Sequence, residues 1–552
     1  MKRLLIAGAS GALLIAAFAI PAQASGYGAD PSLTKDIWAG TADSSPKFSA
    51  VLGSRLVFDA STAAAGSQPW ITDGTTAGTK IIKTIKTGGS NPYGFVSFKG
   101  KVYFGATDAT HGEELWVTDG TATGTKLVKD IYPGATSSGP GHFTVAGTRL
   151  FFSAKTAAAG DELWKTDGTT AGTALVKDIN PGATSSSINF LKAWGSKVVL
   201  NATSAAGAEP WISGGTSATT FALGDISSGV TNSAPANFTV VGTNVIFGAT
   251  SPSTGYELWK SNGTANSATL VKDIGAGATG SSPSQLFAYG GAVLFRATRA
   301  GEGAELWASD GTAGGTQLVR DIYDGVGDSA PASFTVFNGA VYFSASTAAE
   351  GNELWVTRGG ASNTHLVRDT VPGPTTGSPT GLRAVGPVLT FGNESQTRGN
   401  ELWQSDGTSA GTVPVLDIYP GAPSSYPSPL GVVANTLFFD AEEGTHGNEL
   451  WSYTTRPSTS HVSPASSYTH SAGANKKIYV KVSVTATGTI PTGKVTLKHG
   501  TTVYGYATLS GGKATIHITK ALGKGSYSVK AYYSGSVQAR TSISATKYVK
   551  VQ

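Results

Sequence analysis

The sequence contains no cysteine among its 552 residues. This absence excludes disulfide bonds, a thiol nucleophile, a Cys-ligated zinc site and a lipidated N-terminal cysteine. Charged residues are also scarce, at 14%, whereas the 73 glycines make the chain rich in turns. Such a composition favours many short strands over long helices. The fold must therefore be stabilised by burial and hydrogen bonds.

Acidic residues are missing from the C-terminal part of the chain. Residues 458–552 contain eleven lysines and one arginine but no Asp or Glu, which gives a net charge of +12. Residues 25–457 contain 26 basic and 35 acidic residues, which gives a net charge of −9. Two modules of opposite charge therefore meet near residue 457.

Long apolar runs are missing too, apart from one at the N-terminus. Lys2 and Arg3 precede an apolar stretch from Leu4 to Ile20, and Ala22-Gln23-Ala24 forms an A-x-A cleavage signal. This order predicts a secretory signal peptide over residues 1–24, with a retained membrane anchor as the alternative. We therefore expect a secreted protein, either soluble or attached to a cell surface.

A tryptophan recurs at intervals of 46 to 48 residues. The nine positions are Trp70, Trp116, Trp164, Trp211, Trp259, Trp307, Trp355, Trp403 and Trp451. A period in the forties is typical of β-propellers and solenoids. Within one unit, residues 143–147, 148–154, 162–168 and 173–179 each read as a short β-strand, and four strands per unit is the content of a propeller blade.

Positions around each tryptophan are nearly constant among the units. Gly stands four residues before it in all nine units, and Glu stands two residues before it in eight, with Gln68 as the exception. Such glycines permit turns with positive φ. Asp-Gly pairs such as Asp119-Gly120 are typical of the hairpin that joins strands three and four. The aromatic side chains are expected to fill the layers between neighbouring units.

The two ends of the array complement each other. The last unit ends after its third strand, "NELWSYT", whereas an orphan copy of the fourth strand, "SLTKDIW" at residues 32–38, precedes the first unit. We predict that the N-terminal strand completes the last blade and closes a nine-bladed propeller, because closure leaves no unpaired face. The alternatives are eight blades with an irregular unit, or an open superhelix.

The repeat resembles the bacterial ELWxxDGT repeat family, as residues 114–121, "ELWVTDGT", illustrate. The resemblance covers about residues 30–455 and implies a secreted, propeller-like protein without an assigned activity. We place the propeller at residues 30–453. Residues 454–470 are rich in Ser, Thr and Pro and are predicted to be a linker.

Residues 471–552 alternate in hydrophobicity over six or seven short runs, which predicts an Ig-like β-sandwich. The stretches "PTGKVTLKHG", "GGKATIHITK" and "GSYSVKAYYSGS" resemble bacterial Ig-like repeats, which implies a stalk or attachment role on surface proteins. The net positive charge of this module would attract polyanions such as phosphate polymers, acidic polysaccharides, anionic lipids or DNA. A merely soluble surface is the alternative.

Two sets of carboxylates recur with the repeat. One comprises Glu114, Glu162, Glu209, Glu257, Glu305, Glu353, Glu401 and Glu449, and the other Asp36, Asp130, Asp178, Asp225, Asp273, Asp321, Asp369 and Asp417. Rings of carboxylates are able to bind Ca²⁺ or act as acid and base. Equivalent copies are poorly suited to catalysis, which needs one asymmetric pair, so we expect these acids to accept hydrogen bonds or to pair with Lys and Arg.

The residue after each "KDI" motif is the one asymmetric feature that we single out. Aromatic residues stand there in several units: Trp38, Tyr132, Tyr323 and Tyr419. Exposed aromatic rings along an arc of the rim would stack on sugar rings, although they would also serve to cover their own loops.

The sequence contains no catalytic constellation, no metal-binding spacing, no cofactor fingerprint and no motif for specific nucleic-acid recognition that we could identify. We therefore predict a non-enzymatic binding or adhesion protein. Its propeller would bind a polysaccharide or protein partner, and its basic Ig-like domain would attach it to an anionic envelope or polymer. The alternatives are an extracellular polysaccharide hydrolase or lyase with its acids in the propeller, and a structural surface-layer component.

Overall fold

The computed structural model describes residues 30–455 and, in the C-terminal part, residues 460–464, 468–470, 478–486, 493–519, 522, 524–533, 542–543 and 546–551. The predicted signal peptide lies outside the described residues. Nine four-stranded antiparallel sheets follow one another along the chain, as the repeat predicts. We number them one to nine in chain order.

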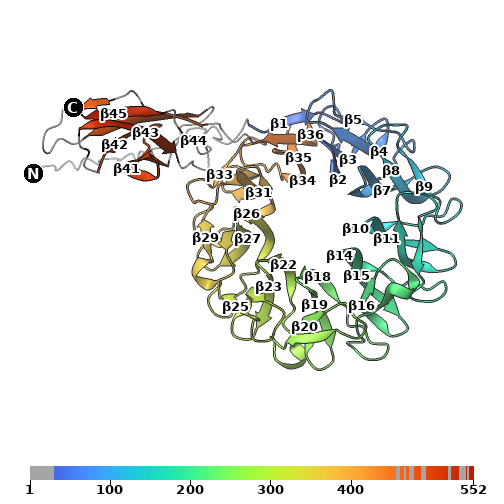
Figure 1. Cartoon of the computed structure of the whole chain (residues 1–552). Coiled ribbons are helices and arrows are strands. Elements are labelled where there is room, and N and C mark those ends of the chain that lie inside the picture. Colours follow the sequence, from blue (N-terminus) through green and yellow to red (C-terminus); the bar gives the residue numbers. More distant parts are fainter. Residues whose placement is uncertain are drawn as a thin grey trace, which may run out of the picture.

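The first strands of the sheets lie on the inner side of a ring, and the fourth strands lie on its outer side (Figure 1). The first strands are β2 (Lys47–Leu52), β6 (Tyr93–Phe98), β10 (Gly141–Ala146), β14 (Asn189–Trp194), β18 (Ala236–Val241), β22 (Ser284–Tyr289), β26 (Ala332–Phe337), β30 (Thr380–Val385) and β34 (Ser428–Val433). The fourth strands are β5 (Lys80–Ile81), β9 (Lys126–Lys129), β13 (Ala174–Lys177), β17 (Thr220–Ala222), β21 (Thr269–Lys272), β25 (Gln317–Arg320), β29 (His365–Arg368), β33 (Val413–Pro414) and, in sheet nine, β1 (Ser32–Lys35).

The second and third strands form the buried middle of each sheet. The second strands are β3 (Arg55–Thr62), β7 (Lys101–Thr107), β11 (Arg149–Thr156), β15 (Lys197–Ser204), β19 (Asn244–Ser251), β23 (Ala292–Arg299), β27 (Ala340–Thr347), β31 (Val388–Ser395) and β35 (Thr436–Glu443). The third strands are β4 (Gly66–Thr72), β8 (Glu113–Thr118), β12 (Gly160–Thr166), β16 (Gly207–Ser213), β20 (Gly255–Ser261), β24 (Gly303–Ser309), β28 (Gly351–Thr357), β32 (Gly399–Ser405) and β36 (Gly447–Thr454). Three short 3-10 turns interrupt the connections: η1 (Ser217–Thr219), η2 (Gly277–Thr279) and η3 (Ala361–Asn363).

The hydrophobic core is divided into layers between neighbouring sheets. In one such layer, Val128 and Ile131 of sheet two pack against Phe152 and Trp164 of sheet three. The repeated Trp and Phe therefore fill the spaces between units, as their size predicts. A basic side chain bridges the same layer, since Lys129 Nζ donates a hydrogen bond of 2.8 Å to the carbonyl oxygen of Thr173.

Sheets nine and one are joined by the same kinds of contact. Strand β1 pairs antiparallel with β36, matching Leu33 with Trp451. Lys35 Nζ donates to the Thr79 carbonyl oxygen of sheet one at 2.8 Å, just as Lys129 bridges sheets two and three. On the inner side, Ser49 Oγ of β2 donates to the Leu430 carbonyl oxygen of β34. The strand that precedes the first repeat is therefore the fourth strand of the ninth sheet.

The C-terminal part folds around its own hydrophobic core. One sheet contains β37 (Ser460–Pro464), β39 (Tyr479–Ala486) and β42 (Lys513–His517). The other contains β38 (Tyr468–His470), β45 (Lys547–Val551), β43 (Gly525–Tyr533), β40 (Lys494–His499) and β41 (Thr502–Thr508), with β44 (Ser542–Ile543) paired to β43. Strands β37 and β38 fall within the segment that the sequence predicts as a linker, and each pairs with a strand of this sandwich.

Candidate functional site

The repeated glutamates are buried and hold the loops of the rim. Glu114 Oε2 accepts hydrogen bonds from the Ile131 N–H at 2.9 Å and from the Ser138 hydroxyl at 2.7 Å. Its Oε1 accepts from the N–H groups of Tyr132 and Ser138 at 3.2 and 3.1 Å. Burial raises the pKa of Glu114, and the hydrogen bonds from Ser138 and the backbone lower it in part. This carboxylate is a structural acceptor, as expected for the repeated acids.

Glu449 performs this task at the seam between the two ends of the array. It accepts hydrogen bonds from the N–H groups of Ile37 at 2.9 Å and Trp38 at 3.1 Å, and from the Ser44 hydroxyl at 2.6 Å. Gln68 takes the same place in sheet one, where its Oε1 accepts from the Ile85 N–H at 3.0 Å. The carboxylate is therefore replaceable by an amide at this position.

The repeated aspartates also serve the backbone. Asp130 Oδ2 accepts a hydrogen bond from the Gly134 N–H at 3.2 Å, and the other copies accept from the equivalent glycine. Among the residues that the structure describes, no group of three or more His, Cys, Asp or Glu side chains is arranged to hold a metal ion.

The four predicted rim aromatics lie on four separate loops, each of which follows the fourth strand of a different sheet. Trp38, Tyr132, Tyr323 and Tyr419 are all half-buried. The Tyr323 ring lies over Gly327 of its own loop, where an added Cβ would come within 2.0 Å of it. The Tyr419 ring similarly lies against Gly444 of the next sheet. At least these two rings cover loops.

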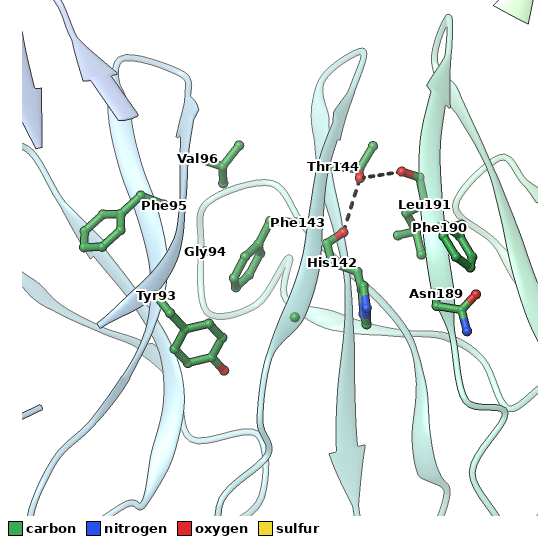
Figure 2. A pocket seen from close by; sticks show the side chains of 11 residues that line it. Tyr93, Gly94, Phe95, Val96, His142, Phe143, Thr144, Asn189, Phe190 and Leu191 are labelled. Carbon is green, nitrogen blue, oxygen red and sulfur yellow. Dashed lines mark hydrogen bonds between the residues drawn. The ribbon is translucent and has the colours of Figure 1, made fainter. Parts of the chain in front are cut away.

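A groove lies instead on the inner side of the ring, across β6, β10 and β14, with a volume of about 620 Å³. Figure 2 labels ten of the residues that line it, Tyr93, Gly94, Phe95, Val96, His142, Phe143, Thr144, Asn189, Phe190 and Leu191, and Gly141 also belongs to the lining. The Thr144 hydroxyl joins two of the three strands, since it lies 3.2 Å from the His142 carbonyl oxygen and 3.4 Å from that of Leu191. The groove is therefore built from three successive repeats.

A β-bulge in each of the first strands β10 and β14 determines where the variable side chains of this groove lie. The register of β10 on β11 shifts between Gly141 and Thr144, and that of β14 on β15 shifts between Asn189 and Lys192. His142 and Phe190, which lie inside these bulges, have φ of 55° and 52°. The equivalent residues of the other sheets are Phe48, Gly94, Asn237, Gln285, Ser333, Gly381 and Pro429. Here the repeat varies in residue type, whereas its buried Glu and Trp scarcely vary.

Phenylalanine is an unfavourable choice for this backbone conformation. Left-handed φ suits Gly and Asn, and a bulky residue there is a genuine outlier that costs of the order of 1–3 kcal/mol. Phe48 and Phe190 nevertheless occupy it, and they remain 50% and 51% exposed. Because neither ring is buried, neither recovers this cost through packing in the core. Phe190 also lines the groove, so strain and exposure together mark it as a functional candidate.

Polar and titratable groups border the groove. The Tyr93 hydroxyl lies 2.5 Å from Glu113 Oε1 and 2.9 Å from the Pro140 carbonyl oxygen, and its ring occupies the space left by Gly105. Burial, reinforced by Glu113, raises the pKa of Tyr93.

On the neighbouring sheet, His142 Nδ1 lies 3.2 Å from Ser153 Oγ. Burial raises the pKa of the nearby Asp161, with His142, Lys155 and Ser153 lowering it in part. The serine lies between the histidine and the carboxylate, so the order is not that of a Ser-His-Asp triad, in which the histidine is central. The groove therefore offers aromatic rings beside hydrogen-bonding groups.

Sequence reasoning missed the groove, and it directed attention to the outer loops. A usable signal was present, because the second residue of each first strand varies from Phe to Gly, His, Asn and Gln, whereas the Gly and Glu positions before each Trp are nearly constant. Its meaning depended on the bulge, which turns that residue away from a regular strand position.

Comparisons with known proteins bear mainly on the C-terminal domain. Residues 463–552 match the model of the bacterial Ig-like domain (group 3), whereas the sequence prediction began this domain at residue 471. The C-terminal residues are therefore a bacterial Ig-like domain, a kind of domain typical of extracellular proteins. No curated protein matches the chain. None of the helices in the described residues is long and apolar enough to cross a membrane.

Three solved structures illustrate a distant similarity. A puromycin-hydrolyzing peptidase of Mycobacterium tuberculosis is 9% identical with a TM-score of 0.39, and the match covers 81% of this chain and 64% of that one. Prolyl oligopeptidase B from Galerina marginata is 9% identical with a TM-score of 0.35, covering 63% and 54%. An uncharacterized protein from Listeria monocytogenes is 9% identical with a TM-score of 0.32, covering 60% and 97%. The chain thus spans little more than half the length of the second peptidase, and we draw no activity from these matches.

Proposed function

We propose that this protein is a surface-associated binding protein in which a closed nine-bladed β-propeller of the ELWxxDGT type binds a polysaccharide. The C-terminal Ig-like domain attaches it to an anionic polymer. The observation that carries the first part is the inner groove, where the exposed Phe190 ring stands on a strained backbone beside His142 and Asn189. Closure of the propeller is supported by the pairing of β1 with β36.

The chemistry of the groove favours a carbohydrate. Flat aromatic faces stack on the C–H faces of sugar rings, and the amide, imidazole and hydroxyl groups around them hydrogen-bond to sugar hydroxyls. The groove crosses three repeats, so it suits an extended chain rather than a single compact ligand.

A retention assay on insoluble neutral polysaccharides tests this proposal. Wild-type protein is incubated with cellulose, xylan, chitin and β-1,3-glucan, and the bound fraction is measured. F190N should weaken binding to the retained polysaccharide about tenfold, because it removes the ring. Asn tolerates positive φ, so F190N should fold at least as well as wild type.

Phe48 provides a matched control. It has the same bulge position and nearly the same exposure, but it does not line the groove. F48N should bind the neutral polysaccharide as wild type does. Equal losses in F190N and F48N, or no binding by wild type to any polysaccharide of the panel, would contradict the proposed site.

The alternative function is a polysaccharide hydrolase or lyase. It is favoured by carboxylates that differ from the repeated set and stand on four consecutive sheets: Asp440, Asp59, Glu113 and Asp161. Burial raises the pKa of Asp59 and of Asp440 to about 6, with hydrogen bonds from Ser67 and Asn448 lowering it in part. Release of reducing ends or unsaturated products by wild type, abolished in D161N, would establish this alternative in place of binding alone.

A further inference from the structure

The larger sheet of the C-terminal domain carries lysine and tyrosine side chains on one face. Alternation along β40 and β43 buries Val495, Leu497, Val529 and Ala531 in the core, so the residues between them face outward. The residues of this outward set, which we call the Lys–Tyr face, are Lys494, Thr496, Lys498, Val503, Tyr506, Thr508, Ser526, Ser528, Lys530, Tyr532, Tyr548 and Lys550. Four strands contribute to it.

The lysines and tyrosines of this face are interleaved rather than segregated. Lys494 Nζ lies 3.6 Å from the centre of the Tyr506 ring, and Lys498 Nζ lies 4.9 Å from that of Tyr532. Lys498 stands opposite Lys530 on the neighbouring strand. Two like charges on directly opposite residues repel each other, so this pair reduces the stability of the sheet. The contact with the Tyr532 ring offsets part of this repulsion for Lys498, and an anionic ligand would offset more of it.

Two further properties define the ligand. Residues 458–552 contain no acidic residue that would neutralise these lysines within the domain. The Tyr506 and Tyr548 side chains are 63% and 49% exposed, so flat aromatic surface is available beside the charges. The hydroxyl groups of Thr496, Ser526 and Ser528 lie on the same face.

We infer that the Lys–Tyr face binds a carboxylate-bearing polysaccharide, with lysines pairing with uronate groups and tyrosine rings stacking on sugar rings. The inference rests on the proposed attachment role of this domain and names its surface and its ligand class. Single carboxylates spaced along a chain match lysine point charges. A lipid bilayer would instead call for several apolar residues that insert, whereas the large exposed side chains of this face are Val503, opposite Lys498, and the tyrosines Tyr506 and Tyr548.

The test measures binding of the full chain to polygalacturonate, with neutral dextran, single-stranded DNA and phosphatidylserine vesicles as competitors. K498Q/K530Q should weaken binding to polygalacturonate about tenfold, and Y506S about threefold without any change of charge. The matched control is K481Q/K513Q, which removes the same charge from the opposite sheet of the domain. It should weaken binding less than about twofold.

Several outcomes would overturn the inference. Equal losses in K498Q/K530Q and K481Q/K513Q would mean that net charge alone attracts the polymer. Tighter binding of DNA or vesicles than of polygalacturonate would assign a different partner class. Absence of binding to every anionic probe would refute the attachment role itself. An F190N variant that still binds neutral polysaccharides as wild type does would refute only the proposed site in the inner groove of the propeller.

Discussion

The ring and the C-terminal domain present their side chains in contrasting ways. The ring repeats one buried framework nine times and varies residues of its inner strands, so that Phe190, His142 and Gly94 stand where other sheets have Asn237 or Gln285. The sequence of the C-terminal domain shows no comparable internal repeat. It instead carries positive charge without any Asp or Glu over residues 458–552. The two proposed binding surfaces would therefore arise by two routes: local variation on a repeated scaffold, and a uniform electrostatic face.

Replacement of a tryptophan between sheets should have the largest effect on stability. W164A removes a buried ring that packs against Val128 and Ile131 of the preceding sheet, and it should lower the free energy of unfolding by about 3–5 kcal/mol. Chemical denaturation followed by circular dichroism measures this change. Y506A in the C-terminal domain, where the ring is exposed and contacts Lys494, should change it by less than about 1 kcal/mol. Similar losses in both variants would remove the distinction between framework and surface aromatics.

The seam between sheets nine and one should be as strong as the other layers. E449A leaves the N–H groups of Ile37 and Trp38 without their acceptor and should cost about 2–4 kcal/mol. The matched variant is E114A, which removes the same bonds within a continuous stretch of chain. Hydrogen exchange should show opening of β1 and β36 in E449A, and opening of β8 and its loop in E114A. An unchanged exchange pattern in E449A would contradict the role of β1 in sheet nine.

Salt should separate the two binding surfaces. Raising NaCl from about 50 to about 500 mM should weaken binding of the full chain to polygalacturonate about thirtyfold, since screening reduces attraction between exposed charges. Binding to the neutral polysaccharide should change by less than about twofold, because stacking and hydrogen bonding in the groove involve little net charge. Equal salt dependence of both would show that one surface binds both polymers.

The smallest effect should come from a buried carboxylate of the ring. The pKa of Asp440 in the folded protein is about 6, above its ordinary value of 3.8, because of burial. Its contribution to stability is therefore fully present below about pH 4 and is lost as pH rises through about 6. D440N should raise the melting temperature by about 1–3 °C at pH 8 and leave it nearly unchanged at pH 4.

Asp167 provides the contrast of opposite sign. Hydrogen bonds from Thr169 lower the pKa of this exposed carboxylate, so its contribution is present at neutral pH and is lost as pH falls. Melting curves of D167N should show its loss of stability at pH 8 rather than at pH 3.

For Asp440, the contradicting result is a D440N variant that is destabilised at pH 8. It would mean that the ionised Asp440 carboxylate makes a net favourable contribution to stability.

Much of the ring was predictable because each repeat supplies the same local signals. The strand predicted at residues 148–154 is observed as Arg149–Thr156, and the Gly and Glu positions around each Trp indicated the turn and the buried acceptor. The left-handed bulge was not predictable, since "GHFTVA" and "NFLKAW" look like ordinary alternating strands. Only the register against the second strand reveals that His142 and Phe190 break that alternation.

The C-terminal domain shows the reverse limitation. Its charge and its six main strands could be read from composition and alternation, but β37 and β38 lie in a stretch rich in Ser, Thr and Pro that reads as a linker. Their pairing with β39 and β45 depends on partners far along the chain, which local composition does not encode. The binding roles of Trp38, Tyr132, Tyr323 and Tyr419 remain a prediction.

One crossed binding experiment tests the central claim, that two independent surfaces bind two kinds of polymer. The full-length wild type, F190N, K498Q/K530Q and the combined variant are each titrated against polygalacturonate and against the neutral polysaccharide that wild type retains best. The account predicts that F190N loses only the neutral polymer, that K498Q/K530Q loses only the acidic one, and that the combined variant loses both. A single variant that loses both polymers, or a combined variant that keeps both, would contradict it.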